Sequence, residues 1–314
     1  MDQKEKYDLT QEEYEKCLKM AELAIFINAK KAEKPTSVFV VAQPGAGKTG
    51  LRSYIECEYR NCETTLPFIE FDPDVVAIHH KYYKEILEEF PNESYRRLQK
   101  FVSPALDKYL RYRAVQLRNN IIQEGTFAAT PGYITILDFQ KNGGELPYGT
   151  KNQKVEGNYF IDINVLAVHR YESLLSSYER EQYVFIENDL LPRVVTPDNH
   201  DRAYKNILET MKAVEEKDLY SRIRVYRRGK TENTPELVYE KGEEKYPNSV
   251  QALIGEREKN KQELLANPEK YLDRIRTLKE RIMHNKINSE NQLERINNLE
   301  QEFLRELELK KDAR

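Results

Sequence analysis

The sequence predicts an α/β protein in which a mainly parallel sheet is flanked by helices, with a helical hairpin or coiled-coil appendage at the C-terminus. Two observations lead to this fold class. Short apolar segments rich in β-branched residues alternate with segments of helical periodicity over most of the chain, and the last part is charged and helical throughout. Such alternation is typical of parallel sheets wrapped by helices. We therefore expect a main domain over residues 1–245 and a charged helical extension over residues 246–314.

Length and composition limit the class of protein. The 314 residues leave room for about two domains, and the net charge of −3 gives no electrostatic reason to expect a nucleic-acid partner. No apolar run approaches the roughly 20 residues of a membrane span, and the N-terminus has no hydrophobic segment that could act as a secretory signal. Cys17, Cys57 and Cys62 show neither metal-ligand nor redox spacing. These features predict a cytoplasmic protein with reduced thiols and no membrane partner.

The first half of the chain contains two clear helix-start signals. Thr10-Gln11-Glu12-Glu13 is a capping box, and Pro35 follows the helix that it opens. Ser103-Pro104 pairs a capping serine with a proline suited to a first turn. The expected elements are a helix over residues 10–32, strands over 37–42 and 68–71, a helix over 103–118 and a strand over 120–126.

The second half continues the alternation and then changes character. Apolar residues at helical spacing follow both Asn267-Pro268 and Ser289, which predicts two helices in the extension. These helices form either a hairpin of their own or two helices docked on the main domain. The other expected elements are a loop or insertion over 141–154, a strand over 159–168, helices over 171–187 and 201–217, and a strand over 222–226.

A glycine-rich loop joins the first apolar strand to a helix. It matches the phosphate-binding loop, or P-loop, except that Ala42 stands at the first glycine position. In such a loop, backbone N–H groups and the positive end of the helix surround nucleotide phosphates. Lys48 is expected to reach the outer phosphates, and the Thr49 hydroxyl is expected to hold Mg²⁺. The predicted nucleotide-binding residues are Gln43, Pro44, Gly45, Ala46, Gly47, Lys48 and Thr49.

Polar residues also follow two other predicted strands. Asp72 and Asp74 come after the second strand, and Glu124 ends the third. Ligands of parallel sheets bind at the carboxyl ends of the strands, so Lys48, Asp74 and Glu124 are expected at one edge. Asp72 and Asp74 have a simpler alternative role as caps of the following helix.

These motifs, in this order and spacing, resemble the zeta toxins, the kinase partners of epsilon-type antitoxins. The similarity spans roughly Glu33 to Tyr226 and includes the loop with Leu51-Arg52 and the acidic turn with His80. The remaining motifs that carry it are Pro35-Thr36, Glu124-Gly125-Thr126, Tyr178-Glu179-Arg180-Glu181, Arg193 with Thr196-Pro197, and Ile223-Arg224-Val225-Tyr226.

The resemblance implies an ATP-dependent kinase that phosphorylates the 3′-hydroxyl of the amino sugar in UDP-N-acetylglucosamine, a reaction that starves cell-wall synthesis. It implies that Asp74 is the base at the acceptor hydroxyl and that Glu124 and Thr126 bind the sugar nucleotide. Arg180 and Arg193 would contact the phosphoryl group being transferred. It also implies a separate small helical antitoxin that blocks the nucleotide site.

Two departures from the family pattern concern the acceptor. Phe127-Ala128-Ala129 follows Thr126 where the family usually continues with an arginine, and the insertion over 141–154 is expected near the same edge. A kinase with another nucleotide or a small alcohol as acceptor therefore remains an alternative. A second alternative is a nucleotide-binding interaction module without phosphotransfer, whose helical tail recruits a partner.

Arg180 also has an alternative role. It lies among glutamates that can form a solvated, salt-bridged helix face.

Overall fold

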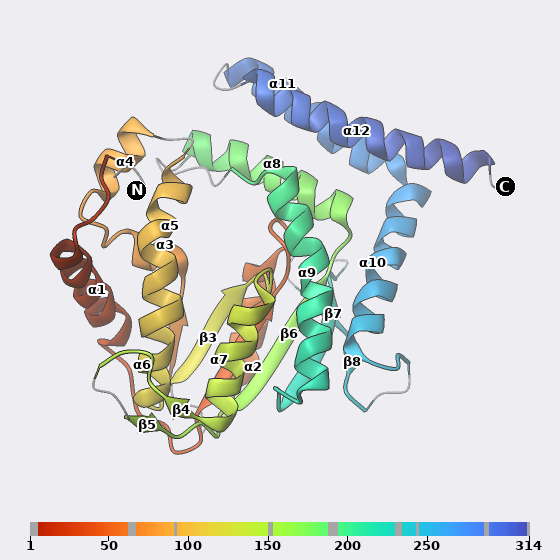
Figure 1. Cartoon of the computed structure of the whole chain (residues 1–314). Helices are drawn as coiled ribbons and strands as arrows, with labels where there is room; N and C mark the ends of the chain where they lie inside the picture. Colours follow the sequence, from red (N-terminus) through yellow and green to blue (C-terminus); the bar gives the residue numbers. More distant parts are fainter. Residues whose placement is uncertain are drawn as a thin grey trace.

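The structure, a computed structural model, describes residues 6–61, 67–90, 93–149, 153–187, 194–229, 234–242, 245–285 and 289–312. Within these residues a six-stranded sheet has the order β2-β3-β1-β6-β7-β8 (Figure 1). The first five strands are parallel, and β8 is antiparallel to β7. The strands are β1 (Thr36–Val41), β2 (Phe68–Phe71), β3 (Asn120–Gly125), β6 (Phe160–Ala167), β7 (Arg222–Arg227) and β8 (Glu236–Glu240). The predicted α/β fold with a mainly parallel sheet is confirmed.

The strand register brings three strand ends together. Val41, the last residue of β1, is paired with Gly125 of β3. Phe71, the last residue of β2, is paired with Gln123 of β3. The segments that follow β1, β2 and β3 therefore leave the sheet at one edge, as expected for a ligand site of a parallel sheet.

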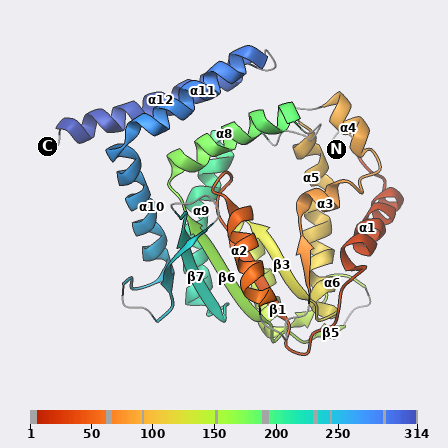
Figure 2. The same ribbon diagram turned by 180° about the vertical axis from the view of Figure 1, so that it is seen from behind.

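Helices cover both faces of the sheet. Helix α2 lies on one face, whereas α7 and α9 lie on the other (Figures 1 and 2). The helices of this part are α1 (Gln11–Phe26), α2 (Lys48–Arg60), α3 (Pro73–Ala77), α4 (Tyr83–Glu89), α5 (Ser94–Ala105), α6 (Arg111–Gln116), α7 (Thr130–Asn142), α8 (Arg170–Glu187) and α9 (Pro197–Glu216). A π-helical turn over Leu106–Leu110 joins α5 to α6, and a small hairpin is formed by β4 (Gly144–Glu145) and β5 (Lys154–Val155).

The alternation of side chains in β1 supplies apolar groups to both faces. Val38 and Val40 pack with Leu51 and Ile55 of α2, whereas Phe39 belongs to the larger core on the opposite face. All of these side chains are almost completely buried. A strand buried on both faces reads as a continuous apolar run, which is the pattern of β1.

The C-terminal part consists of α10 (Ser249–Ala266), α11 (Pro268–Asn285) and α12 (Ser289–Asp312). Helix α10 packs beside β6, β7 and β8, and α11 and α12 pack against each other and on α8 (Figure 1). A second hydrophobic core fills the space between α8 and this pair. It includes Tyr178 of α8, Tyr271 and Ile275 of α11, and Phe303 of α12. The predicted helix starts at Pro268 and Ser289 are confirmed.

Three predicted helices have different bounds, and one of them, α9, begins at Pro197 and not at Asp201. Thr10 caps α1 with a complete capping box, but the helix ends at Phe26 and not near Ala32. Lys31 instead forms an isolated bridge with Asn119, so the chain has already left the helix. Ser103-Pro104 does not start a helix, because α5 begins at Ser94 and runs through Pro104. Buried apolar residues upstream of the proline favour the longer helix, and the turn that follows widens to a π-helix.

The insertion lies at the opposite edge from its expected place. Helix α7 leaves the carboxyl edge and runs back toward the amino ends of the strands, where β4 and β5 form the small hairpin (Figure 1). There the backbone N–H of Tyr159 donates to the Gln140 carbonyl, just before β6 begins. The expectation that this insertion lies near the acceptor is therefore wrong for residues 141–149 and 153–154, because the whole length of α7 separates them from that edge.

Among the described residues, no helix combines the length and the apolar character that a membrane span requires.

Candidate functional site

The glycine-rich loop has the geometry of a phosphate-binding loop. Gly45 and Gly47 have φ angles of 72° and 95°, a conformation that favours glycine. Gly47 is the N-cap of α2, and no side chain caps the helix there. The positive end of the α2 helix dipole lies at this turn and favours negative charge there.

Lys48 and Thr49 occupy the first turn of α2. The Lys48 Nζ donates hydrogen bonds to the carbonyl oxygens of Ala42 (3.1 Å) and Gln43 (3.3 Å), so the ammonium group lies over its own loop. The Thr49 side chain belongs to an exposed residue at the same helix end. Both residues lie at the start of the helix that follows the loop. Their contacts with phosphate and metal stay predictions.

Gln43 anchors the start of the loop. Its side chain is fully buried; Nε2 donates to the Val168 carbonyl (2.7 Å) and to Ser173 Oγ (3.0 Å), and Oε1 accepts from Arg257 of α10 (3.1 Å). Burial lowers the pKa of Arg257 to about 10. Any contact between Gln43 and a nucleotide would therefore come from its backbone, because its side chain is bound within the protein.

Helix α8 approaches the loop closely at Gly45. A Cβ at this position would lie 2.0 Å from the Ser173 carbonyl oxygen and 2.4 Å from Ser177 Oγ. Only glycine fits this contact. Pro44 is half-buried and Ala46 is fully buried, so the predicted nucleotide-binding segment is also a packing surface for α8.

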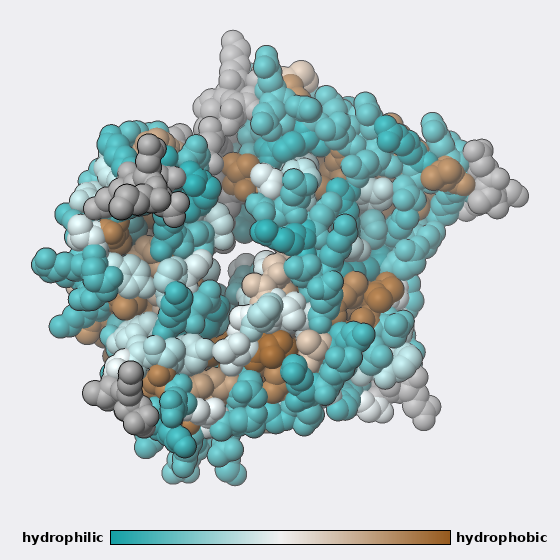
Figure 3. Space-filling view, viewed as in Figure 1, coloured by the Kyte–Doolittle hydropathy of each residue, from teal (hydrophilic) through white to brown (hydrophobic). Residues whose placement is uncertain are grey.

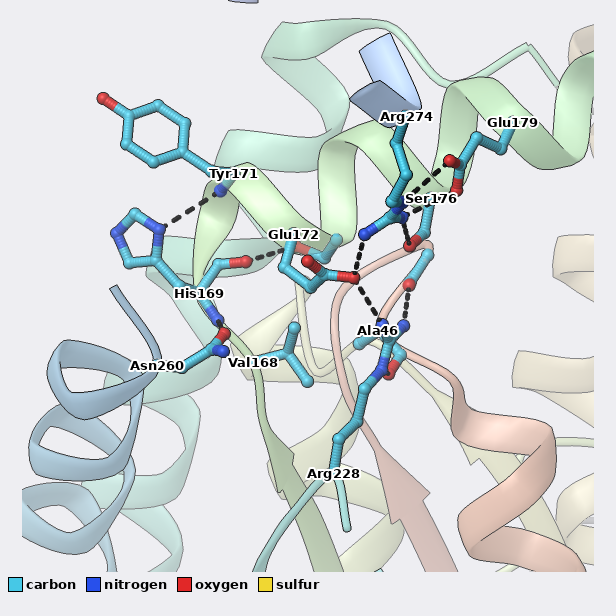
Figure 4. A network of polar contacts seen from close by, with 12 residues as sticks. Ala46, Val168, His169, Tyr171, Glu172, Ser176, Glu179, Arg228, Asn260 and Arg274 are labelled. Carbon is cyan, nitrogen blue, oxygen red and sulfur yellow. Dashed lines mark hydrogen bonds and ion pairs between the residues drawn. The ribbon is translucent and has the colours of Figure 1, made fainter. Parts of the chain in front are cut away.

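Arg228, which follows β7, holds the outer side of the loop. Its Nε donates to the Ala46 carbonyl (2.9 Å) and one terminal nitrogen donates to the Gly45 carbonyl (2.7 Å). The other terminal nitrogen binds Glu172 of α8 at 2.9 Å, and the same carboxylate oxygen accepts from Arg274 of α11 at 2.7 Å (Figure 4). Sequence reasoning missed Arg228, Arg257 and Arg274. The position of Arg228 at the end of a parallel strand was the one available signal.

The two aspartates of the acidic turn after β2 occupy different positions in α3. Asp72 is the N-cap of α3, and its Oδ1 accepts a hydrogen bond of 2.8 Å from the Asp74 backbone N–H. The capping alternative thus holds for Asp72. Asp74 is exposed in the first turn of α3, where its own side chain is not the cap.

Glu124 lies beside the loop helix. Its carboxylate is 3.7 Å from Arg52 of α2, which also binds Glu70 and Glu56. Burial raises the pKa of Glu124, while the charges of Lys48 and Arg52 oppose that rise. The Glu124 carboxylate is therefore close enough to Lys48 and Arg52 to interact electrostatically with both.

The turn after Glu124 is fixed from the far face of the sheet. Thr126 is half-buried, and Phe127 adopts a φ of 48° with its ring fully buried in the main core. The Thr210 hydroxyl of α9 donates to the Phe127 carbonyl (2.7 Å), and Asn206 donates to the Ala128 carbonyl (2.8 Å). Phe127 therefore serves packing, and the residues of this turn present no positive charge to the acceptor side.

Of the two arginines predicted to contact phosphate, the structure describes one. Arg180 is an exposed residue of α8. Its acidic neighbours bind the C-terminal helices, since Glu179 pairs with Arg274 (2.7 Å) and Glu181 with Arg295 (2.9 Å). Arg193 lies outside the described residues, as does Cys62.

The site opens into a hollow. Figure 3 shows this hollow between the lobe that carries the N-terminal helices and the side formed by α8 and α9. In the described part of the chain, no group of three or more His, Cys, Asp or Glu side chains could hold a metal ion. Lys48, Asp74, Glu124 and Thr126 all follow or end strands at the edge on this side, so the arrangement can align a phosphate donor with a second substrate.

Comparisons with known proteins identify one family. The sequence model of the family described as Zeta toxin matches residues 22–147 and 149–237. "Toxin zeta" of Streptococcus agalactiae is 25% identical over 224 residues, which are 70% of each chain. "Toxin zeta" of Enterococcus hirae is 26% identical over 203 residues, or 64% of each chain. "Toxin PezT" of Streptococcus pneumoniae is 22% identical over 71% of this chain and 81% of its own.

A solved structure supports the fold. A chain from the PezAT chromosomal toxin-antitoxin system of Streptococcus pneumoniae superposes with a TM-score of 0.65 at 19% identity, covering 88% of this chain and 100% of its own. The family match includes the P-loop, the acidic turn and the Glu124 turn. The chain therefore belongs to the zeta toxin family.

Proposed function

We propose that the protein is an ATP-dependent kinase that transfers the γ-phosphoryl group to the 3′-hydroxyl of the amino sugar in UDP-N-acetylglucosamine. The observation that supports this proposal is that the P-loop after β1 and the exposed Asp74 after β2 leave the sheet at the same edge, with β3 between the two strands. Family membership supports a toxin kinase, and the sugar nucleotide follows from the resemblance. The protein would act in the cytoplasm.

The donor side would bind Mg-ATP. The N–H groups at the start of α2 hold the phosphates, and Lys48 moves from the loop carbonyls to the outer phosphates. The Thr49 hydroxyl is a hard oxygen ligand of the kind that Mg²⁺ prefers, and the phosphates would complete much of the coordination. Phosphoryl transfer needs little covalent help, so alignment and charge neutralisation account for most of the catalysis.

The acceptor side would position the sugar. Asp74 takes the proton of the acceptor hydroxyl as the new bond to phosphorus forms. Glu124 and Thr126 bind the sugar nucleotide, and Arg180 and Arg193 neutralise the equatorial oxygens of the transferring group. By relation to toxin-antitoxin proteins, a separate small helical antitoxin would restrain the enzyme by blocking the nucleotide site.

Two isosteric substitutions test this mechanism with matched geometry. Asp74→Asn should lower kcat by about 10² to 10⁴-fold while ATP affinity changes little, since only the proton acceptor is lost. Asp72→Asn is the control, because asparagine caps a helix as well as aspartate. Phosphorylated sugar nucleotide is followed by mass spectrometry in the presence of Mg-ATP. Equal rates for the wild type and Asp74→Asn would contradict the assignment of the base.

The same assay separates the second candidate, a kinase with another acceptor. The observation that favours this candidate is the turn at Phe127, which brings no arginine to the acceptor side. ATP consumption without a change in UDP-N-acetylglucosamine would support it. ATP binding without consumption would instead support an interaction module.

A further inference from the structure

Helix α8 lies between the P-loop and the C-terminal helices and contacts both. On one side, Ser173 and Ser177 lie against Gly45. On the other side, Leu174, Leu175 and Tyr178 are buried in the second core, which α11 and α12 complete. A shift of the C-terminal pair would therefore reach the loop through a single packed helix.

A polar chain runs parallel to this packing. Arg274 of α11 binds Glu179 at 2.7 Å and 2.9 Å, and it also donates to Ser176 Oγ at 3.1 Å. Its other terminal nitrogen donates to Glu172, which holds Arg228 on the loop carbonyls (Figure 4). Positive and negative groups alternate from α11 to the P-loop. Apart from the bonds to Ser176 and to the loop carbonyls, every hydrogen bond in this network joins two charged groups. Hydrogen bonds between charged groups are stronger than those between neutral groups.

The direction of the charges suits phosphate binding. The guanidinium of Arg228 lies at the carbonyl side of the Gly45 and Ala46 peptide groups. A cation at the carbonyl end and an anion at the N–H end polarise peptide groups in the same sense. Arg228 thus favours the loop conformation that a phosphate also favours.

Glu172 has to be shared for this geometry to hold. Its side chain is only 13% exposed, and a single oxygen accepts from both arginines. Without Arg274, the Glu172 carboxylate would lose the hydrogen bond that fixes it on the α11 side. Glu172 and Arg228 could then move away from the loop together. Arg274 is also beyond residue 237, where the family match ends.

We propose that Arg274 is a positioning residue for the nucleotide: through Glu172 it keeps Arg228 on the P-loop, so the C-terminal helices set nucleotide affinity. This inference rests on the proposed nucleotide binding at the loop. The helices after residue 245 then form part of the donor site, although they supply no group to the phosphates.

The test measures the affinity of the full-length protein for the magnesium complex of a non-hydrolysable ATP analogue by calorimetry. Arg274→Ala should weaken binding about tenfold, and Arg274→Lys should recover part of the loss because lysine keeps the charge without the planar fork. Arg276→Ala is the matched control in the same helix, where a 68% exposed side chain pairs only across one turn with Asp273. It should bind like the wild type.

A double-mutant cycle tests whether Arg274 acts on the loop through Arg228. Arg228→Ala should weaken binding, and adding Arg274→Ala should cost much less than it does alone, because both act through one contact. Where Arg274→Ala does not fold, Glu172→Gln breaks the same chain with an isosteric side chain and should also weaken binding. Wild-type affinity in a folded Arg274→Ala or Glu172→Gln variant, or full additivity in the cycle, would overturn the inference alone. Failure of the wild type to bind the analogue would overturn it together with the proposed function.

Discussion

The donor and acceptor sides of the site are held by different kinds of contact. The loop on the donor side is fixed by distant parts of the chain: Gln43 binds Arg257, and Gly45 and Ala46 bind Arg228. On the acceptor side, Asp74 stands exposed in a short helix capped by its neighbour Asp72. The donor loop is therefore part of the packed interior, whereas the acceptor carboxylate depends on local geometry.

This difference follows from the chemistry that each side would perform. Nucleotide phosphates must meet a fixed set of N–H groups, so the loop benefits from rigid support. An acceptor hydroxyl needs one proton acceptor at hydrogen-bond distance, which can be carried by a short segment. We therefore expect substitutions on the donor side to affect both binding and stability, and those at Asp74 to affect turnover.

The largest effect expected on the donor side is that of replacing Lys48. Lys48→Ala should lower kcat for ATP consumption by about 10³-fold, because the charge that stabilises the outer phosphates is lost. Lys212→Ala, a 70% exposed lysine of α9, should retain the wild-type rate. Expression of the wild type should slow growth, and Lys48→Ala should relieve that effect. Equal growth of the two strains would argue against a toxic kinase activity.

Gly45 tests how far the donor loop depends on packing. Gly45→Ala should lower the free energy of unfolding by about 1–3 kcal/mol and weaken nucleotide binding, since a Cβ would strike Ser173 and the φ of 72° favours glycine. Gly50→Ala is the control, because nothing lies within 4 Å of a Cβ there and the residue is helical. It should be neutral or slightly stabilising in thermal unfolding. A neutral Gly45→Ala would mean that α8 can move away at little cost.

The acceptor side is tested by two arginines of α2 that share a partner. Arg52 binds Glu56 at 2.7 Å and Glu70 at 2.6 Å with a 21% exposed side chain, whereas Arg60 binds Glu56 with a 75% exposed one. Arg52→Ala should cost about 1.5–3 kcal/mol in chemical denaturation, because charged partners lose their bonds. Arg60→Ala should cost less than about 1 kcal/mol. Similar losses would show that the Glu70 bond contributes little.

The sequence predicted best what depends on neighbouring residues. Apolar runs identified β1 and β6, the capping box at Thr10 located the start of α1, and the A-x-x-x-x-G-K-T pattern from Ala42 to Thr49 located the loop between β1 and α2. Each of these signals acts within a few residues, where propensity and hydrogen-bond geometry decide the outcome.

Contacts between residues far apart in the sequence were not predictable. Glu172 and Arg274 are 102 residues apart, and the glutamates around Arg180 resembled a face that pairs within its own helix. In the structure, helices from the C-terminal part take those partners. The place of the insertion was misjudged because no helix was expected over residues 130–142, and a helix that joins two parallel strands runs back to their amino ends. Pro104 was misread because buried neighbours outweighed its preference for a first turn.

The smallest expected effect concerns Glu124 and depends on pH. Burial raises the pKa of this carboxyl in the folded protein above its value in the unfolded chain. Its contribution to stability is then complete below the unfolded pKa and is lost as the pH rises through the folded pKa. Glu124→Gln removes this loss, so in thermal unfolding the variant should be more stable than the wild type at pH 8 and should differ little from it at pH 4.

Asp74→Asn is the control for Glu124, since an exposed carboxyl should show no comparable gain at pH 8. A stabilised Glu124→Gln with weakened binding of the sugar nucleotide would show that the acceptor side keeps a buried charge for function at the expense of stability. A destabilised variant would instead assign Glu124 to the structural pairing with Arg52, and the acceptor side would then resemble the donor side in its dependence on buried ion pairs.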